Sequence, residues 1–257
     1  MTIGMPANET FEPVTIVNEE GSGPFVLVCD HASNFMPECY GHLGLSSEAL
    51  QAHISWDPGA LGVSLQLSKL LDAPLIYSNV SRLIIDCNRE TVAPDLIPCR
   101  SELTDIPGNA DLDADERERR IALSHKPFHD TIDRLIDARQ SKGASSALVS
   151  VHSYTPIYKG ETRPWEIGLI YGDDASLAKP ALQLLKNRTS YTVGDNEPYS
   201  PADGVYYTLQ RHGEARGLVP LMIEIRNDEI ATPDAEAAWA ATLAPILKDA
   251  LAQAGGK

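Results

Sequence analysis

Three side chains that can take part in chemistry stand where apolar runs of the sequence end. His31 follows residues 25–29, His152 follows residues 147–151, and Glu224 follows residues 218–223. In open α/β sheets, ligands bind outside the carboxyl ends of the strands. Imidazole suits zinc, and a catalytic zinc keeps three protein ligands and one open position. Two histidines and a glutamate in this context therefore predict a single-metal hydrolase site.

The third metal ligand is open at this point. A single histidine at a strand end is more often structural, but the shared context of His31 and His152 favours a metal pair. An oxygen ligand is expected beside two histidines, and the candidates are Asp57, Glu38, Asp30 and Asn34. Asp57 also reads as a helix N-cap before Pro58. The other histidines lie in helix or loop contexts and are expected to have no role in the site; they are His42, His53, His125, His129 and His212. His53 remains a secondary candidate because it is near Asp57 in the sequence.

Glu224 ends an apolar run, where a carboxylate is costly to bury unless it is paired or functional. The functional interpretation is a general base that takes a proton from the attacking water and then delivers it to the leaving amine. The alternative is a salt bridge with Arg226 or another arginine. Alternation along a strand puts Glu224 and Arg226 on the same face, so Arg226 is also expected to reach the site.

Several arginines are candidates for binding a substrate carboxylate, because the planar guanidinium can bind a carboxylate through two parallel hydrogen bonds. Asn88 and Arg89 follow the apolar residues 83–85 and are expected to clamp the substrate. Arg82 precedes the same residues and can instead pair with Asp86. Arg163, beside Pro164 and Trp165, is a second candidate for substrate binding.

Strand-like and helix-like segments alternate along the chain, which predicts one mostly parallel mixed sheet with helices on both faces. Residues 1–22 are expected to be a loosely ordered lead-in, and residues 23–257 a single domain. Expected strands cover residues 25–29, 75–77, 83–85, 147–151, 167–171, 191–193 and 218–225. Expected helices cover residues 46–53, a segment opening at 57–58, and residues 113–140, 177–187, 206–212 and 233–252.

Composition limits the classes of partner. The formal net charge of the 257 residues is −15, which argues against nucleic acids and anionic membranes. There is no signal-peptide pattern and no run long enough to span a membrane, so a cytoplasmic location is expected. The four cysteines are scattered, which disfavours a zinc–thiolate site. No glycine-rich nucleotide-binding loop follows a strand.

Five motifs in a fixed order resemble the N-formylglutamate amidohydrolase family. They are residues 30–34 (DHASN), the helix after Asp57, residues 81–89 (SRLIIDCNR), residues 151–156 (VHSYTP) and residues 223–226 (IEIR). The resemblance covers residues from about 25 to about 230. The family is distantly similar to zinc carboxypeptidases, aspartoacylase and succinylglutamate desuccinylase. It implies a three-layer α/β/α fold of the phosphorylase/hydrolase type.

The resemblance also implies roles for residues. His31 and His152 become ligands of one Zn²⁺ per chain, Asn88 and Arg89 the carboxylate clamp, and Glu224 the base. One position departs from the pattern: zinc carboxypeptidases have His-x-x-Glu, whereas Asn34 stands at the glutamate position here. The carboxylate ligand is therefore not carried over, and Asp57 is inferred from its place in the chain.

The combined prediction is a zinc-dependent amidohydrolase that acts on a small N-acyl amino acid, with N-formyl-L-glutamate giving formate and L-glutamate. Arg82 or Arg226 is expected to stabilise the tetrahedral oxyanion together with the metal. The alternatives are a zinc peptidase or another N-acyl amino acid deacylase on the same site. A further alternative, suggested by Asn34, is a binding protein that has lost the metal. The sequence leaves the oligomeric state open.

Overall fold

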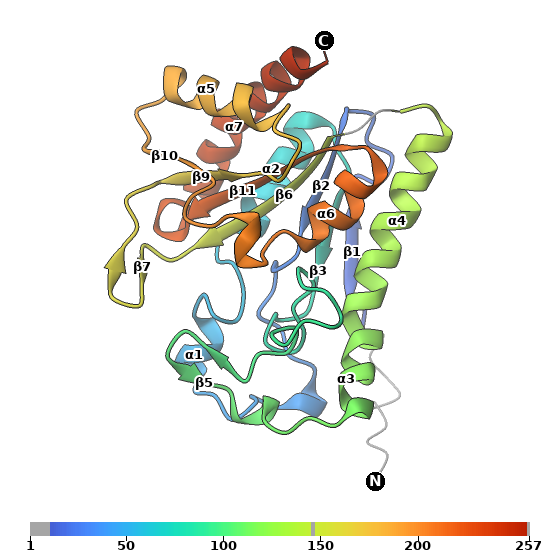
Figure 1. Ribbon diagram of the computed structural model, residues 1–257, viewed down its shortest axis with the longest axis vertical. Coiled ribbons are helices and arrows are strands. Elements are labelled where there is room, and N and C mark those ends of the chain that lie inside the picture. The colour runs from blue at the N-terminus through green and yellow to red at the C-terminus, as the bar shows by residue number, and fades with distance from the viewer. Residues whose placement is uncertain (1–10, 145–146, 256–257) are drawn as a thin grey trace.

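The computed structural model describes residues 11–144 and 147–255, and its centre is a seven-stranded sheet (Figure 1). The strand order is β1-β3-β2-β6-β11-β9-β10. These strands are β1 (Val14–Val17), β2 (Phe25–Cys29), β3 (Leu75–Ser78), β6 (Ala147–Tyr154), β9 (Ile167–Ile170), β10 (Val193–Asp195) and β11 (Val219–Arg226). Two short hairpins lie outside this sheet: β4 (Arg100–Ser101) with β5 (Thr104–Asp105), and β7 (Ile157–Tyr158) with β8 (Glu161–Thr162).

The central strands run in the same direction, which brings their carboxyl ends to one edge of the sheet. Strand β2 is parallel to both β3 and β6, and β6 is parallel to β11. The sheet is mixed because β1 pairs antiparallel with β3 and β9 pairs antiparallel with β11. Every residue of β2 and β6 is buried. This explains their continuous apolar sequences, because a strand covered on both faces has no solvent side to mark with polar residues.

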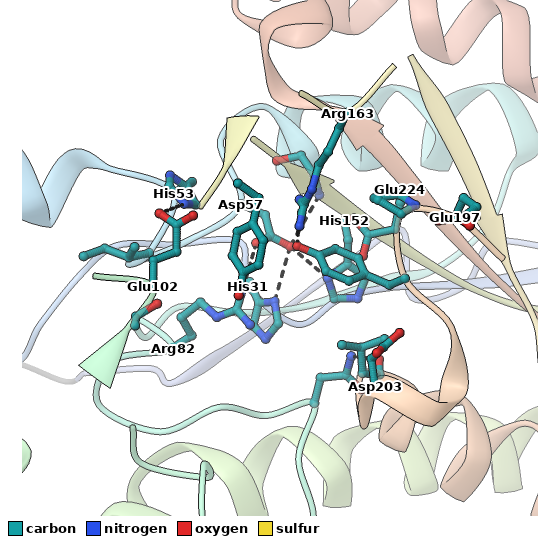
Figure 2. Close-up of a pocket in the computed structure, with 18 of the residues that line it drawn as sticks. His31, His53, Asp57, Arg82, Glu102, His152, Arg163, Glu197, Asp203 and Glu224 are labelled. Atoms are coloured by element: carbon teal, nitrogen blue, oxygen red, sulfur yellow. Dashed lines mark hydrogen bonds and ion pairs between the residues drawn. The ribbon is translucent and has the colours of Figure 1, made fainter. Parts of the chain in front are cut away.

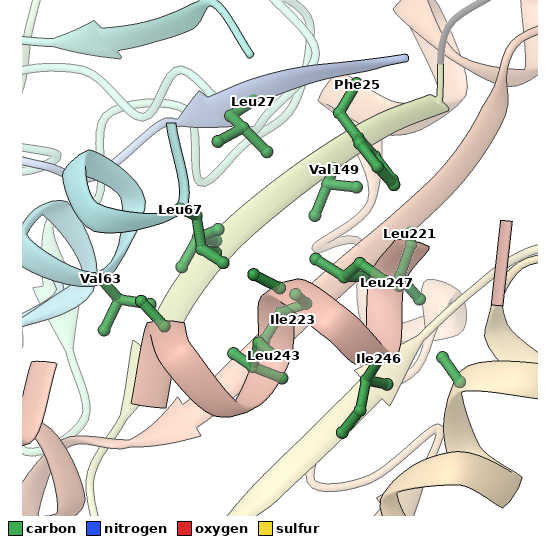
Figure 3. Close-up of a cluster of buried hydrophobic side chains, with 14 of the residues drawn as sticks. Phe25, Leu27, Val63, Leu67, Val149, Leu221, Ile223, Leu243, Ile246 and Leu247 are labelled. Carbon is green, nitrogen blue, oxygen red and sulfur yellow. The ribbon is translucent and has the colours of Figure 1, made fainter. Parts of the chain in front are cut away.

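Helices cover both faces of the sheet, which confirms the predicted three-layer α/β/α fold (Figure 1). On one face, Leu27, Val149 and Ile223 pack with α2 (Ala60–Leu71), α5 (Ala178–Arg188) and α7 (Pro233–Ala254) (Figure 3). On the other face, Val28 and Leu148 pack with α4 (Lys126–Ser141) and α6 (Tyr207–His212). The chain also forms α1 (Ser47–Gln51) and α3 (Ala114–Arg120). A π-helical segment over residues 121–125 joins α3 to α4.

Two expectations about the elements are wrong. Residues 14–17 do not belong to a loose lead-in, because they form β1 and close one edge of the sheet against β3; residues 1–10 lie outside the described residues. Residues 83–85 are not a strand either. Their apolar side chains fill a separate small core with residues such as Leu43 and Ile106. A short apolar run has the same appearance in a strand and in a buried turn.

The segment between β3 and α3 is long and irregular, yet it is tied firmly to the rest of the fold. Arg120 is buried and donates hydrogen bonds to the Ile84 carbonyl, at 3.2 Å, and to Asn109 Oδ1, at 2.7 Å. Asn109 in turn donates to the Leu83 carbonyl. This segment carries Arg82, so its fixed path helps to position the site.

Within residues 11–144 and 147–255, no helix combines the length and the apolar character that crossing a membrane requires.

Candidate active site

A cavity of about 650 Å³ opens at the carboxyl edge of the sheet, where β2, β6 and β11 end side by side (Figure 2). Nearly all the residues that the sequence proposed for the site line this cavity. They are His31, Asp57, Arg82, Asn88, Arg89, His152, Arg163 and Glu224. The tertiary structure therefore brings together residues that are up to 193 positions apart, from 31 to 224.

Asp57 lies between the two strand-end histidines. Its Oδ2 atom is 2.8 Å from His152 Nδ1 and 3.3 Å from His31 Nδ1. One ligand atom from each of these three buried residues lies within 4.8 Å of the others, so the group can hold a metal ion. We call these three residues the metal trio. Asp57 does not cap α2, because Gly59 is the N-cap of that helix.

A second carboxylate faces the outer nitrogen of each histidine. His31 Nε2 lies 2.7 Å from Asp86 Oδ1, and His152 Nε2 lies 3.2 Å from Asp30 Oδ2. Asp30 is held by the hydroxyl groups of Ser150 and Thr208. Metal-binding histidines usually present their other ring nitrogen to a carboxylate or a carbonyl, which fixes the tautomer and the ring orientation. This arrangement leaves both Nδ1 atoms facing Asp57.

The charges of the trio reinforce one another. Burial works against the ionised form of Asp57, but His31, His152 and Arg82 hold its pKa well below the usual range. Burial is also the largest influence on His152, yet Asp30 and Asp57 raise the pKa of its imidazole well above the ordinary value. Without a metal, the histidines therefore tend to hold protons that a bound cation would have to displace.

Glu224 lies beside His152, its register partner on the neighbouring parallel strand. Its side chain is 4% exposed and lines the cavity. Burial raises the pKa of the Glu224 carboxyl to about 7, despite the opposing influence of His152. A carboxyl group whose pKa lies near neutral pH is suited to both accepting and donating a proton.

Arg82 connects the carboxylates on either side of His31. Its Nη1 donates to Asp57 Oδ1 and its Nη2 donates to Asp86 Oδ2, both at 3.1 Å. The alternative interpretation of Arg82, a pair with Asp86, is therefore correct and is extended by Asp57. Because Arg82 also lines the cavity, its charge still acts on whatever occupies that space.

The side chains of Asn88 and Arg89 line the cavity but are held by other parts of the protein. Asn88 Nδ2 donates to the Val205 carbonyl, and Asn88 Oδ1 accepts from the backbone N–H of Thr208 at 3.0 Å. Arg89 Nε donates to Asp95 Oδ2 at 2.8 Å. Both ends of the Asn88 amide thus anchor the start of α6 and the preceding Val205, which the sequence did not indicate.

Arg226 is not brought to the cavity with the other predicted residues. Its guanidinium pairs with Asp228 at 2.8 Å and with Glu229 at 3.0 Å, both in the 3₁₀ segment that follows β11. Alternation along β11 predicts that Arg226 and Glu224 share one face of the strand. Arg226 is the last residue of β11, however, and the chain turns there into the 3₁₀ segment. The long arginine side chain therefore meets local carboxylates instead of the site.

Arg163 lines the cavity and is surrounded by the side chains of Tyr154, Tyr158 and Tyr199. Its guanidinium carbon lies 4.4 Å from the ring centre of Tyr158 and 4.8 Å from that of Tyr199. Arg163 Nη1 donates to the Tyr199 hydroxyl at 2.9 Å. In Figure 2, Arg163 and Arg82 approach the metal trio from opposite sides. In the sequence, Tyr199 is an aromatic residue between two nearby prolines, and such loops often have only a packing role.

Asn34, Glu38 and His53, the remaining candidate ligands, make their contacts away from the metal trio. Asn34 donates its amide to the Leu50 carbonyl at 3.0 Å. Glu38 begins an exposed 3₁₀ segment, and His53 pairs with Glu102 at 3.2 Å. The trio is complete without a side chain at position 34, so the departure there does not remove the site.

Comparison with known proteins places this geometry in context. The family model described as N-formylglutamate amidohydrolase matches residues 23–231. The crystal structure of gene product Atu2144 from Agrobacterium tumefaciens is 43% identical, with a TM-score of 0.92 over 94% of this chain and 96% of that chain. The N-formylglutamate amidohydrolase from Ralstonia eutropha JMP134 is 20% identical, with a TM-score of 0.70 over 95% of this chain and 99% of that chain, and shares the fold. No curated protein matches the chain.

Proposed function

Because this chain belongs to the N-formylglutamate amidohydrolase family, we propose that it is a zinc-dependent hydrolase of N-acyl amino acids. N-formyl-L-glutamate, which would give formate and L-glutamate, is the first substrate to test. The observation that carries the proposal is the position of Glu224 beside a buried trio of His31, Asp57 and His152. Family membership supports hydrolysis of an amide bond, and the trio supports the metal.

The donor set fits a single zinc ion. Two imidazole nitrogens and one carboxylate oxygen are typical ligands of a catalytic zinc site, which leaves one coordination position open. Asp86 and Asp30 face the outer nitrogens of the two histidines, as expected for ligands whose orientation is fixed. When bound, zinc would polarise the acyl carbonyl and lower the pKa of water.

The side chains around the trio supply proton transfer, stabilisation of the developing charge and substrate binding. Glu224 removes a proton from the attacking water and returns it to the leaving amine. Arg82 stabilises the negative charge that develops on the acyl oxygen, because it lines the cavity beside Asp57. Arg163 binds a substrate carboxylate and orients the amide toward Glu224. We assign this anchoring role to Arg163 because Asn88 and Arg89 are already held by protein partners.

Metal removal tests the proposal directly. Hydrolysis of N-formyl-L-glutamate and of other N-formyl amino acids is measured after dialysis against a chelator and again after zinc is added back. We expect activity to be lost and then restored. Activity that survives complete removal of zinc, verified by metal analysis, would contradict the metal mechanism.

The base is tested by Glu224→Gln, which keeps the size of the side chain. We expect zinc content to be unchanged and turnover to fall by about 100-fold or more, as for loss of a general base. Glu118→Gln on the exposed surface of α3 is the matched control and should retain wild-type turnover. Wild-type turnover in the Glu224 variant would exclude this residue as the base.

A further inference from the structure

The arginines that line the cavity differ in whether a carboxylate of the protein already pairs with them, and this difference limits the charge of the substrate. Its arginines are Arg82, Arg89 and Arg163, and no lysine is among the described residues that line it. Arg82 is shared by Asp57 and Asp86. Arg89 is paired with Asp95 at 2.8 Å. Two of the three cations are thus already matched by carboxylates of the protein.

Arg163 differs from the other two arginines because no carboxylate of the described residues pairs with it. Its side chain contacts are the Tyr199 hydroxyl and the faces of Tyr154, Tyr158 and Tyr199. Burial raises the pKa of Tyr199 to about 12, so this partner is uncharged at neutral pH. Arg163 itself is only 8% exposed. A buried arginine is expected to have an anionic partner, and the cavity is where a substrate can supply one.

The same cavity is also lined by four carboxylates besides those of Asp57 and Glu224. We use the term acidic rim for Glu102, Glu161, Glu197 and Asp203, which all line it. Glu102 lies 3.2 Å from His53, but Glu161 and Glu197 are exposed and form no ion pair with the described residues. In Figure 2, Glu102 lies on one side of the metal trio, and Glu197 and Asp203 lie on the other.

We propose that the site accepts one substrate carboxylate, at Arg163, and that the acidic rim receives an uncharged or cationic side chain. This inference rests on the proposed function and narrows its substrate class. It predicts that N-acyl amino acids with one negative charge are better substrates than N-formyl-L-glutamate, which carries two. Each like charge roughly 7 Å away in water weakens binding by about two- to threefold, so the rim as a whole can produce about a tenfold preference.

The main experiment compares substrates of equal size on the zinc-loaded enzyme. N-formyl-L-glutamine has nearly the same shape as N-formyl-L-glutamate and lacks only the side-chain charge. We expect kcat/KM to be at least about fivefold higher for the glutamine substrate. N-formyl-L-lysine should also exceed N-formyl-L-glutamate. As a measurement without turnover, L-glutamine should bind to the zinc-loaded enzyme with a lower Kd than L-glutamate in isothermal titration calorimetry.

Variants separate the role of Arg163 from that of the rim. Arg163→Gln should lower kcat/KM for N-formyl-L-glutamine by about 100-fold, mainly through KM, because a buried charge pair is lost. The loss should be at least about tenfold smaller for N-formyl-L-glutaminamide, which has no carboxylate to bind. Arg163→Lys should be intermediate, because it keeps the charge without the planar fork. An equal loss on both substrates would show a purely structural role for Arg163.

For the rim, the double variant Glu161→Gln and Glu197→Gln should raise kcat/KM for N-formyl-L-glutamate by about threefold or more. The preference for N-formyl-L-glutamine over N-formyl-L-glutamate should therefore fall by a similar factor. Glu118→Gln removes one negative charge from the exposed surface of α3 and should alter kcat/KM for neither substrate. A rim variant without any effect on N-formyl-L-glutamate would remove the rim from the explanation of specificity and overturn that part of the inference.

Failure of the single-carboxylate inference can be distinguished from failure of the proposed hydrolase function. If the zinc-loaded enzyme cleaves N-formyl-L-glutamate as well as or better than N-formyl-L-glutamine, the single-carboxylate inference is wrong and the proposed function stands. If it cleaves no member of a panel of N-formyl, N-acetyl and N-succinyl amino acids, the proposed function itself is wrong.

Discussion

At the residue scale, the site depends on a carboxyl group that the fold holds in an unfavourable place. Glu224 is almost completely buried at the end of an apolar strand, and burial raises its pKa to about 7. In an unfolded chain the same group has a pKa near 4.5. The difference prepares Glu224 to accept and release a proton near neutral pH. It also means that the ionised side chain destabilises the metal-free fold.

The sign of this effect predicts how stability changes with pH. The folded state holds the Glu224 proton more tightly, so stability is lost as pH rises from about 4.5 through about 7. Glu224→Gln removes this loss. We expect metal-free Glu224→Gln to be more stable than wild type by about 1 kcal/mol at pH 5.5 and about 3 kcal/mol at pH 8. Urea unfolding at both pH values, with Glu118→Gln as control, measures the difference. An equal difference at the two pH values would contradict the raised pKa.

At the element scale, a glycine allows two segments to approach each other beside the site. Gly168 on β9 is the register partner of Glu224. A Cβ atom at position 168 would lie 1.8 Å from the Glu197 carbonyl oxygen. The segment that carries Tyr199 can therefore cross β9 only where there is no side chain, and Tyr199 is the hydrogen-bond acceptor for Arg163.

This close approach predicts that Gly168→Ala is harmful to both fold and function. The clash is with backbone, which must shift, so we expect a loss of about 1–3 kcal/mol in unfolding free energy. Displacement of Tyr199 should also raise KM for carboxylate substrates. Gly255→Ala is the control, because a Cβ atom there would have only an ordinary 3.7 Å contact. Gly168→Ala with wild-type stability and KM would show that the segment is free to move.

At the scale of the whole molecule, the metal trio joins parts of the chain that are distant in sequence. His31 follows β2, Asp57 precedes α2 and His152 lies within β6. These segments come together only in the folded state, so a metal that binds the trio also stabilises the fold.

We therefore expect zinc to raise the thermal stability of the protein. Free zinc at 100 times its Kd adds about 2.7 kcal/mol, and a chelator should reverse the change. The gain should be smaller at pH 6 than at pH 8. Asp86 and Asp57 raise the pKa of His31 against the effect of burial, and Asp30 and Asp57 do the same for His152, so protons compete with zinc at lower pH. Differential scanning fluorimetry measures both effects, with magnesium as the control ion. A melting temperature that zinc does not change would contradict the site.

Local pattern was enough to predict most strands and the residues at their carboxyl ends. The runs that end near His31, His152 and Glu224 are continuously apolar because central parallel strands are buried on both faces. Direction along a strand also places such residues at one edge of the sheet. The three-layer fold and most of the residues that line the cavity follow from these local rules.

Contacts between distant segments could not be predicted in this way. Nothing near Asn88 in the sequence shows that Val205 and Thr208 will use its amide, or that local carboxylates will hold Arg226 away from the cavity. Likewise, residues 83–85 have the composition of a strand and form part of a separate core. Partner choice depends on which groups are brought within hydrogen-bond distance after folding. That proximity is a property of the packed molecule, and it leaves Arg163 as the cavity arginine without a carboxylate partner among the described residues.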